Sequence, residues 1–163
     1  MTSRRIIIVV FLVIFGPATA AYADLTAFVG AQVNDERQAF RGAAVGVSLL
    51  IVGFEFEYAR AGEDESSGLS SLTSGSGNVL LQTPIPVFGT RFYFTTGAGV
   101  YREKLERINF QETNLAVNTG GGAKITLLGP LRVRLDYRVI KLRGEPLRPS
   151  VMHRIYAGIN LAF

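Results

Sequence analysis

Acidic and basic side chains at alternate positions are the first candidates for chemistry in this chain of 163 residues. Glu55 and Glu57 stand two apart in an alternating run, so they would share one face of a strand, where two carboxylates could act as an acid/base pair. The run 131–140 alternates in the same way and places arginines and an aspartate on one face. Because we expect the arginines opposite the acids, we favour a structural ion-pair network over an acid/base pair.

Three other motifs carry weaker chemical signals. His153 is the only histidine, and a lone histidine at the start of a strand is typically solvated or interfacial. Gly120-Gly121-Gly122-Ala123-Lys124 lacks the glycine-to-lysine spacing and the following hydroxyl of a phosphate-binding loop. Glu63-Asp64-Glu65 could bind divalent cations or bridge lipopolysaccharide through them, although a solvated charge run is the commoner outcome. No metal-ligand spacing is visible, so we expect no metal and no cofactor.

The elements that must hold these residues are runs in which apolar and polar residues alternate, which is typical of β-strands. Connections after the first, third, fifth and seventh runs are long and polar, whereas the others are shorter and less charged. This rhythm predicts an all-β, eight-stranded antiparallel up-and-down transmembrane barrel. The longest connection, 59–75, is rich in glycine, serine and acid, and we expect it on the outer side. The predicted strands are 25–32, 42–49, 53–58, 76–82, 90–102, 114–127, 131–140 and 153–163.

Alternation alone does not tell which face of each strand points into the barrel, but the positions of the glycines do. Gly97 and Gly99 share a face with Tyr93, and Gly120 and Gly122 share a face with Lys124. Glycine relieves crowding where strands converge inside a narrow barrel, so the charged face should be the inner one. Phe54, Phe94, Leu135 and Leu161 would then face lipid. A barrel of eight strands is filled by its own side chains, so we expect little conductance. The predicted lumen charge network is Glu55, Glu57, Lys124, Arg132, Arg134, Asp136 and Arg138.

The first 23 residues read as a secretory signal peptide, followed by a barrel domain at 24–163. Arg4 and Arg5 precede the apolar stretch 6–15, and Ala21-Tyr22-Ala23 fits a small-x-small cleavage site. The apolar stretch is short for a spanning helix. Removing both arginines lowers the net charge from +4 to +2, which is too mild to indicate nucleic acid as a partner. The chain has no cysteine, so it has no disulfide framework.

The end of the chain, Tyr156-x-Gly158-x-x-Leu161-x-Phe163, resembles the assembly signal of bacterial outer-membrane barrels. With the runs 118–124 and 135–138, it makes the predicted mature chain resemble the small outer-membrane β-barrel family of the outer-membrane protein A and X type. The resemblance implies a location in the Gram-negative outer membrane, insertion by the barrel assembly machinery, and contact with outer-membrane lipids and lipopolysaccharide. It also allows an extracellular ligand at 59–75. It implies no single activity.

The sequence is compatible with four functions. The leading one is an integral outer-membrane protein with a structural or surface-interaction role and no catalysis. A narrow porin-like channel for small solutes or anions is the second. The third is a lipid A-modifying enzyme, although the deacylases of this type place a serine two residues from the histidine, where this chain has Ile155. The fourth is a soluble periplasmic lipid-binding barrel of inverted polarity.

Overall fold

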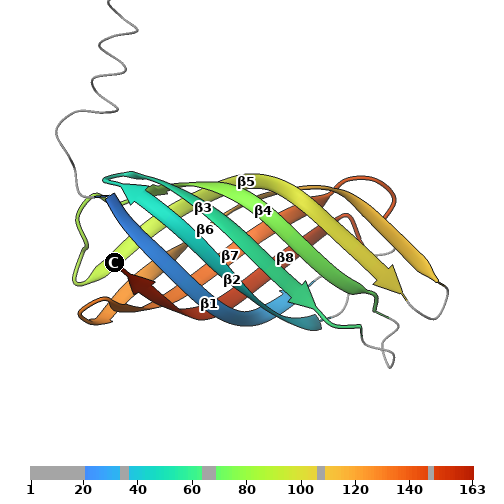
Figure 1. The fold of residues 1–163 in the computed structure, drawn as a ribbon, viewed down its shortest axis with the longest axis horizontal. Helices are drawn as coiled ribbons and strands as arrows, with labels where there is room; N and C mark the ends of the chain where they lie inside the picture. The colour runs from blue at the N-terminus through green and yellow to red at the C-terminus, as the bar shows by residue number, and fades with distance from the viewer. Residues whose placement is uncertain (1–20, 34–36, 64–68, 106–108, 147–148) are drawn as a thin grey trace, which may run out of the picture.

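The structure is a computed structural model that describes residues 21–33, 37–63, 69–105, 109–146 and 149–163. Eight strands form one closed antiparallel barrel in which each strand pairs with its neighbours in the sequence, as predicted (Figure 1). No described residues form a helix that is long and apolar enough to cross a membrane. The strands are β1 (Ala21–Val33), β2 (Arg37–Leu49), β3 (Val52–Ala61), β4 (Ser71–Gln82), β5 (Thr90–Leu105), β6 (Phe110–Leu128), β7 (Leu131–Leu142) and β8 (Val151–Ala162).

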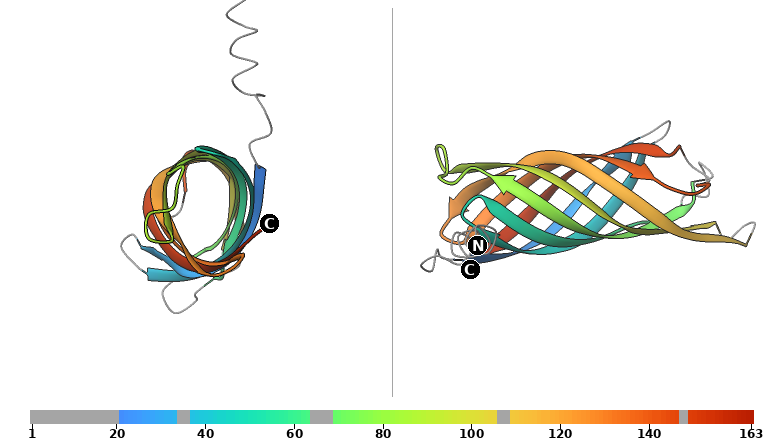
Figure 2. Two further views of the ribbon diagram at one scale, coloured as in Figure 1. Left: turned by 90° about the vertical axis from the view of Figure 1, so that its left-hand side faces the viewer. Right: turned by 90° about the horizontal axis from the view of Figure 1, so that it is seen from above.

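The last strand closes the barrel against the first. The β1–β8 ladder runs from Asp24 opposite Ala162 to Val33 opposite His153. Ala23 and Phe163 exchange two backbone hydrogen bonds of 2.9 Å beyond that ladder. β1 therefore begins, and the chain ends, at the same end of the barrel, which we call the terminal end (Figure 2). Closure leaves no strand edge with unpaired backbone groups, which is the condition for a sheet to lie in lipid.

The barrel carries its apolar side chains outside and its charges inside. Phe54 and Phe94 are 53% and 52% exposed, whereas Arg134 is 0% and Arg138 is 1% exposed. Leu135 and Leu161 also lie on the exposed face. The predicted polarity is therefore confirmed. The alternative of a soluble barrel is wrong for this structure, because it requires the same aromatic and aliphatic side chains to meet in a dry centre.

Most strands are longer than predicted, because polar residues continue the ladders. The predicted loop 59–75 is wrong at both ends, since 59–61 complete β3 and 71–75 begin β4. Residues 37–41 and 103–105 likewise extend β2 and β5 instead of forming loops. Backbone groups pair in a ladder whatever the side chains are, so polarity did not mark the strand ends. The predicted leader falls mostly on residues 1–20, outside the described residues, and β1 already begins at Ala21.

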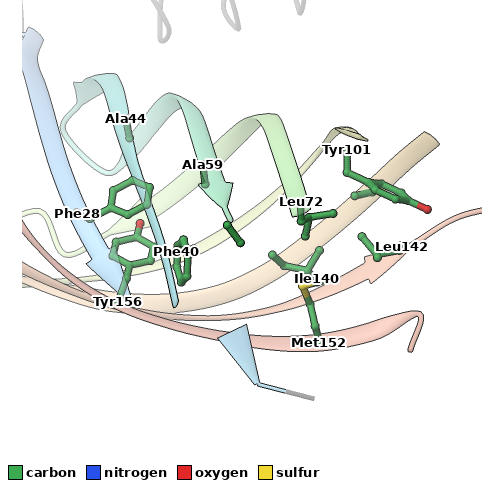
Figure 3. Close-up of a cluster of buried hydrophobic side chains, with 12 residues drawn as sticks. Phe28, Phe40, Ala44, Ala59, Leu72, Tyr101, Ile140, Leu142, Met152 and Tyr156 are labelled. Atoms are coloured by element: carbon green, nitrogen blue, oxygen red, sulfur yellow. The ribbon is translucent and has the colours of Figure 1, made fainter. Parts of the chain in front are cut away.

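The half of the interior farther from the terminal end contains an apolar cluster, which the alternation did not reveal. Phe28 and Phe40 meet at 6.0 Å between ring centroids, edge to face. Leu72, Ile140 and Met152 extend this packing, and Met152 is completely buried (Figure 3). Farther along, buried Gln32, Gln38, Ser70 and Glu103 are linked by hydrogen bonds, so polar side chains fill the interior on both sides of the apolar cluster.

Glycines on the inner face let the strands curve tightly. A Cβ at Gly99 would overlap the carbonyl oxygen of Gly75 and lie 2.6 Å from the Cα of Ser76 on the neighbouring strand. Gly77, on the outer face of β4, has no heavy atom within 4 Å of the same position. Only the inner glycine is therefore required sterically.

Gly99→Ala should destabilise the barrel, whereas Gly77→Ala should not. Forcing a methyl group into a packed position costs roughly 1–3 kcal/mol. An alanine in place of an open strand glycine should be neutral or stabilise by up to about 1 kcal/mol. Urea unfolding of both variants in the same detergent measures the difference. Equal stability of the two variants would contradict the proposed crowding of the inner face.

Candidate functional site

Arg134 on β7 lies at the centre of a charged cluster that crosses the barrel. Its guanidinium forms two hydrogen bonds to the carboxylate of Glu55 on β3, from Nη1 and, at 3.1 Å, from Nη2. Nη2 also donates to Asp136 at 3.1 Å, and Nε donates to the hydroxyl of Tyr93 at 2.7 Å. The Tyr93 hydroxyl in turn donates to Asp136. In an eight-stranded ring β3 and β7 lie on opposite sides, so this pair spans the lumen.

Arg138 continues the charged cluster toward the apolar cluster. It bonds Asp136 through Nε at 2.9 Å and pairs with Glu57 through Nη1 at 3.1 Å. Its Nη2 reaches Glu55 at 3.1 Å and the hydroxyl of Tyr156 at 3.2 Å. Each carboxylate of Glu55 and Asp136 thus contacts both arginines.

Two further ion pairs complete the cluster. Lys124 Nζ lies 2.5 Å from the carboxylate of Asp24, and 5.8 Å from the centre of the Tyr93 ring. Arg154 Nη1 lies 3.6 Å from Glu57. The resulting charged cluster holds four cations and four acids, so their formal charges cancel; its members are Lys124, Arg134, Arg138 and Arg154 with Asp24, Glu55, Glu57 and Asp136.

Glycine makes room for the tyrosine of this cluster. Gly122 on β6 lies opposite both Tyr93 on β5 and Asp136 on β7 in the strand register. A Cβ at Gly122 would overlap the Tyr93 hydroxyl and the Leu135 carbonyl oxygen. The ring can therefore lie over the backbone and present its hydroxyl to Arg134 and Asp136.

Among the residues predicted for the lumen network, the structure brings six together and leaves one aside. Arg132 is half-buried beside the turn at 129–130 and has no ion-pair partner among the described residues. Asp24, Tyr93 and Arg154 join the cluster without having been selected. Parity could have identified Tyr93, which shares a face with Gly97 and Gly99, and Arg154, which shares a face with Gly158. Asp24 was missed because it precedes the first predicted strand.

The four residues of the predicted assembly signal lie in β8 and at its end. Tyr156 is buried in the charged cluster, and Gly158 lies on the same inner face, where Phe28 packs over it. Leu161 and Phe163 lie on the outer face. The position of these residues does not test recognition by an assembly machinery, which stays a prediction.

The other chemical candidates lie apart from the cluster. His153 is on the outer face, with its Nδ1 2.7 Å from the hydroxyl of Tyr137. Gly120 to Lys124 form part of β6 rather than a loop. Asp64 and Glu65 of the acidic run fall outside the described residues. In the described part of the chain, no three His, Cys, Asp or Glu residues form a group suited to a metal ion.

The geometry of the cluster suits bracing rather than proton transfer. The carboxylates of Glu55 and Asp136 accept hydrogen bonds from two arginines each, and Asp136 accepts a further one from Tyr93. Glu55 and Glu57 do not form an acid/base pair with each other in this arrangement, because both are engaged by arginines.

Comparison with known proteins supports the fold through structure rather than sequence. Neither a protein-family model nor a curated protein matches this chain. The N-terminal β-barrel domain of OprF from Pseudomonas aeruginosa is similar, with a TM-score of 0.65 at 16% identity, covering 87% of this chain and 97% of that one. Neisserial surface protein A gives 0.69 at 13% identity, with coverages of 88% and 97%. The outer-membrane enzyme PagL gives 0.53 at 12%, with coverages of 85% and 98%. The chain thus has the fold of small eight-stranded outer-membrane barrels.

Glu55→Gln should strongly destabilise the barrel. The substitution keeps the size of the side chain but leaves two buried arginines short of one negative charge, which typically costs about 3–5 kcal/mol. The free energy of unfolding, measured by urea titration in detergent, reports the loss.

Arg102→Gln is the matched control for Glu55→Gln, because it removes one exposed charge on the outer face. Its effect should stay within about 0.5 kcal/mol. Adding Arg134→Gln to Glu55→Gln should cost less than the two single losses combined, because both partners are then removed. Additive losses would show that the two residues do not act as a pair.

Proposed function

We propose that this chain is an integral outer-membrane barrel protein with a structural or surface-interaction role and a closed interior. The observation that carries the proposal is the charged cluster, whose ion pairs cross the lumen between β3 and β7. Side chains that bond one another across an eight-stranded barrel obstruct passage and stiffen its wall. An exposed apolar outer face, which lipid would cover, supports the membrane location.

Export and membrane insertion would use the two ends of the chain. Residues 1–23 act as a cleaved leader, and Tyr156, Gly158, Leu161 and Phe163 serve as the assembly signal. The end opposite the terminal end then faces the cell exterior, and the connection between β3 and β4 is available to an extracellular ligand. The structural relatives support the barrel fold alone.

The membrane location predicts heat-modifiable behaviour on gels. The folded barrel should resist dodecyl sulfate, because every strand is paired and no edge is open to unfolding. Samples loaded without boiling should therefore migrate differently from boiled ones, and the protein should fractionate with outer membranes. Recovery in a detergent-free soluble fraction would overturn the membrane proposal.

The closed interior predicts no steady conductance. Purified barrel added to planar lipid bilayers should produce no sustained channel, because Arg134 and Arg138 are fully buried within ion pairs. The formal charges of the cluster cancel, so its centre gives no reason for anion selectivity. A steady channel in the nanosiemens range would refute the closed interior and favour the porin-like alternative.

We assign no catalytic step to the chain, although PagL shows that an enzyme can have this fold. His153 hydrogen-bonds to a tyrosine, and Ile155 occupies the position where the deacylase pattern requires serine. Expression of the protein should leave the mass of lipid A unchanged. A change in mass that His153→Gln abolishes would establish the enzyme alternative.

A further inference from the structure

The outer face of the barrel carries charges of only one sign in its eight strands. All acids within the described strands face inward: Asp24, Glu55, Glu57, Glu103, Glu112 and Asp136. The exposed charges on the outer face are cations: Arg37, Arg41, Arg60, Arg102, Lys104 and Lys141. All six lie toward the end opposite the terminal end, because Arg37 and Arg41 are at the start of β2 and the other four are at or near the ends of β3, β5 and β7.

Two of these cations are placed directly against each other. Arg41 on β2 and Arg60 on β3 are register partners. Like charges at directly opposed positions of an antiparallel pair repel. Neither side chain has a carboxylate partner among the described residues, whereas the buried arginines of the charged cluster each have at least one. A bound anion would remove the repulsion.

An apolar hollow lies immediately beside the two arginines. It has a volume of about 840 Å³ and is lined by both of them. Ala27, Ala43 and Ala157 form its shallow floor, and their small side chains leave the space. The register places Ala43 opposite both Ala27 and Tyr58, one inward–outward repeat below Arg41 and Arg60.

A second hollow of about 750 Å³ continues along the same two arginines. Val29, Ala39, Arg41 and Arg60 line it on the outer face. The pair of guanidinium groups thus stands between two open depressions rather than in the middle of a flat surface.

We propose that Arg41, Arg60 and this hollow form a binding site for a phosphorylated lipid of the surrounding leaflet. The planar guanidinium can donate two parallel hydrogen bonds to a phosphate, and two of them on register partners suit a phosphate headgroup. The hollow beneath them accepts an acyl chain, which a free phosphate or a sulfated sugar lacks. The site rests on the proposed function, because the orientation in the outer membrane decides which leaflet supplies the lipid.

The test compares binding of a defined lipid to the folded, delipidated full barrel in dodecyl maltoside. Diphosphoryl lipid A is the probe, and native mass spectrometry counts the lipids that stay bound. Arg41→Gln with Arg60→Gln should weaken retention at least about tenfold, since each charge-assisted contact to phosphate is worth a factor of that order. Arg102→Gln with Lys141→Gln removes the same charge elsewhere on the outer face and should change retention less than about twofold, as expected for exposed charges remote from a site.

A second variant tests the hollow without changing the charge. Ala43→Phe fills its floor from a position that faces lipid, so the fold should tolerate it. This variant should also reduce retention of the lipid, whereas Arg41→Lys with Arg60→Lys should retain part of it. Inorganic phosphate and sucrose octasulfate should compete poorly at equal charge concentration, because they lack acyl chains.

Three outcomes would overturn the site. One is an equal loss in the two charge-removal variants, which would show a diffuse cation belt. Another is retention of dephosphorylated lipid A as strong as that of the probe. The third is full competition by sucrose octasulfate, which would identify a polyanion surface instead. Gel mobility of each variant with and without boiling separates these results from failure of the proposed function, since a chain that is not a membrane barrel shows no heat-dependent shift.

Discussion

Pairing of buried charge is the constraint on which this barrel depends. A carboxylate or guanidinium moved from water into a packed interior costs several kcal/mol unless an opposite charge and hydrogen bonds compensate it. Strand alternation places a charged side chain inside at every second position from Arg132 to Arg138 of β7, so the chain cannot avoid the cost. It offsets the cost with acids on β3, on the other side of the lumen, and with Asp136 between the two arginines. Cross-lumen pairing therefore ties together strands that share no ladder.

Tyr156 joins the apolar cluster to the charged cluster. Its ring stacks on Phe28 at 4.2 Å, and Phe40 approaches it edge to face at 6.2 Å. Its hydroxyl accepts from Arg138 and donates to Glu57, each at 3.2 Å. An aromatic residue with a polar tip can belong to both environments at once. The apolar packing and the charged cluster therefore do not form independent cores, and a shift in one is transmitted to the other.

The alternation of the sequence predicted the strands and their inner and outer faces. It did not predict the strand ends or which interior charges would pair. The alternation in 131–140 and the inward glycines of the fifth and sixth strands were enough to assign the strand order and the wet face, because a period of two admits only two orientations. Strand ends were missed where polar residues continued the ladder, as in 71–75. The partner of each interior charge was not predictable either. The pairing of Arg134 with Glu55 depends on the stagger of the whole closed ring, which no local stretch encodes. Phe28 was overlooked although its parity placed it inside, and Phe40 was missed because its segment was predicted as a loop.

The inner and outer faces of the barrel differ in how their charges are paired. Inside, each acid of the charged cluster forms an ion pair with a cation of the same chain, so no carboxylate of the cluster is left to bind a charged solute. Outside, Arg41 and Arg60 face each other with no acid of the described strands on their surface. The charged cluster is thus neutralised within the chain, whereas the opposed cations on the outer face are not, and the proposed lipid site rests on this contrast. In this proposal the interior accounts for stability, and the outer surface binds the partner.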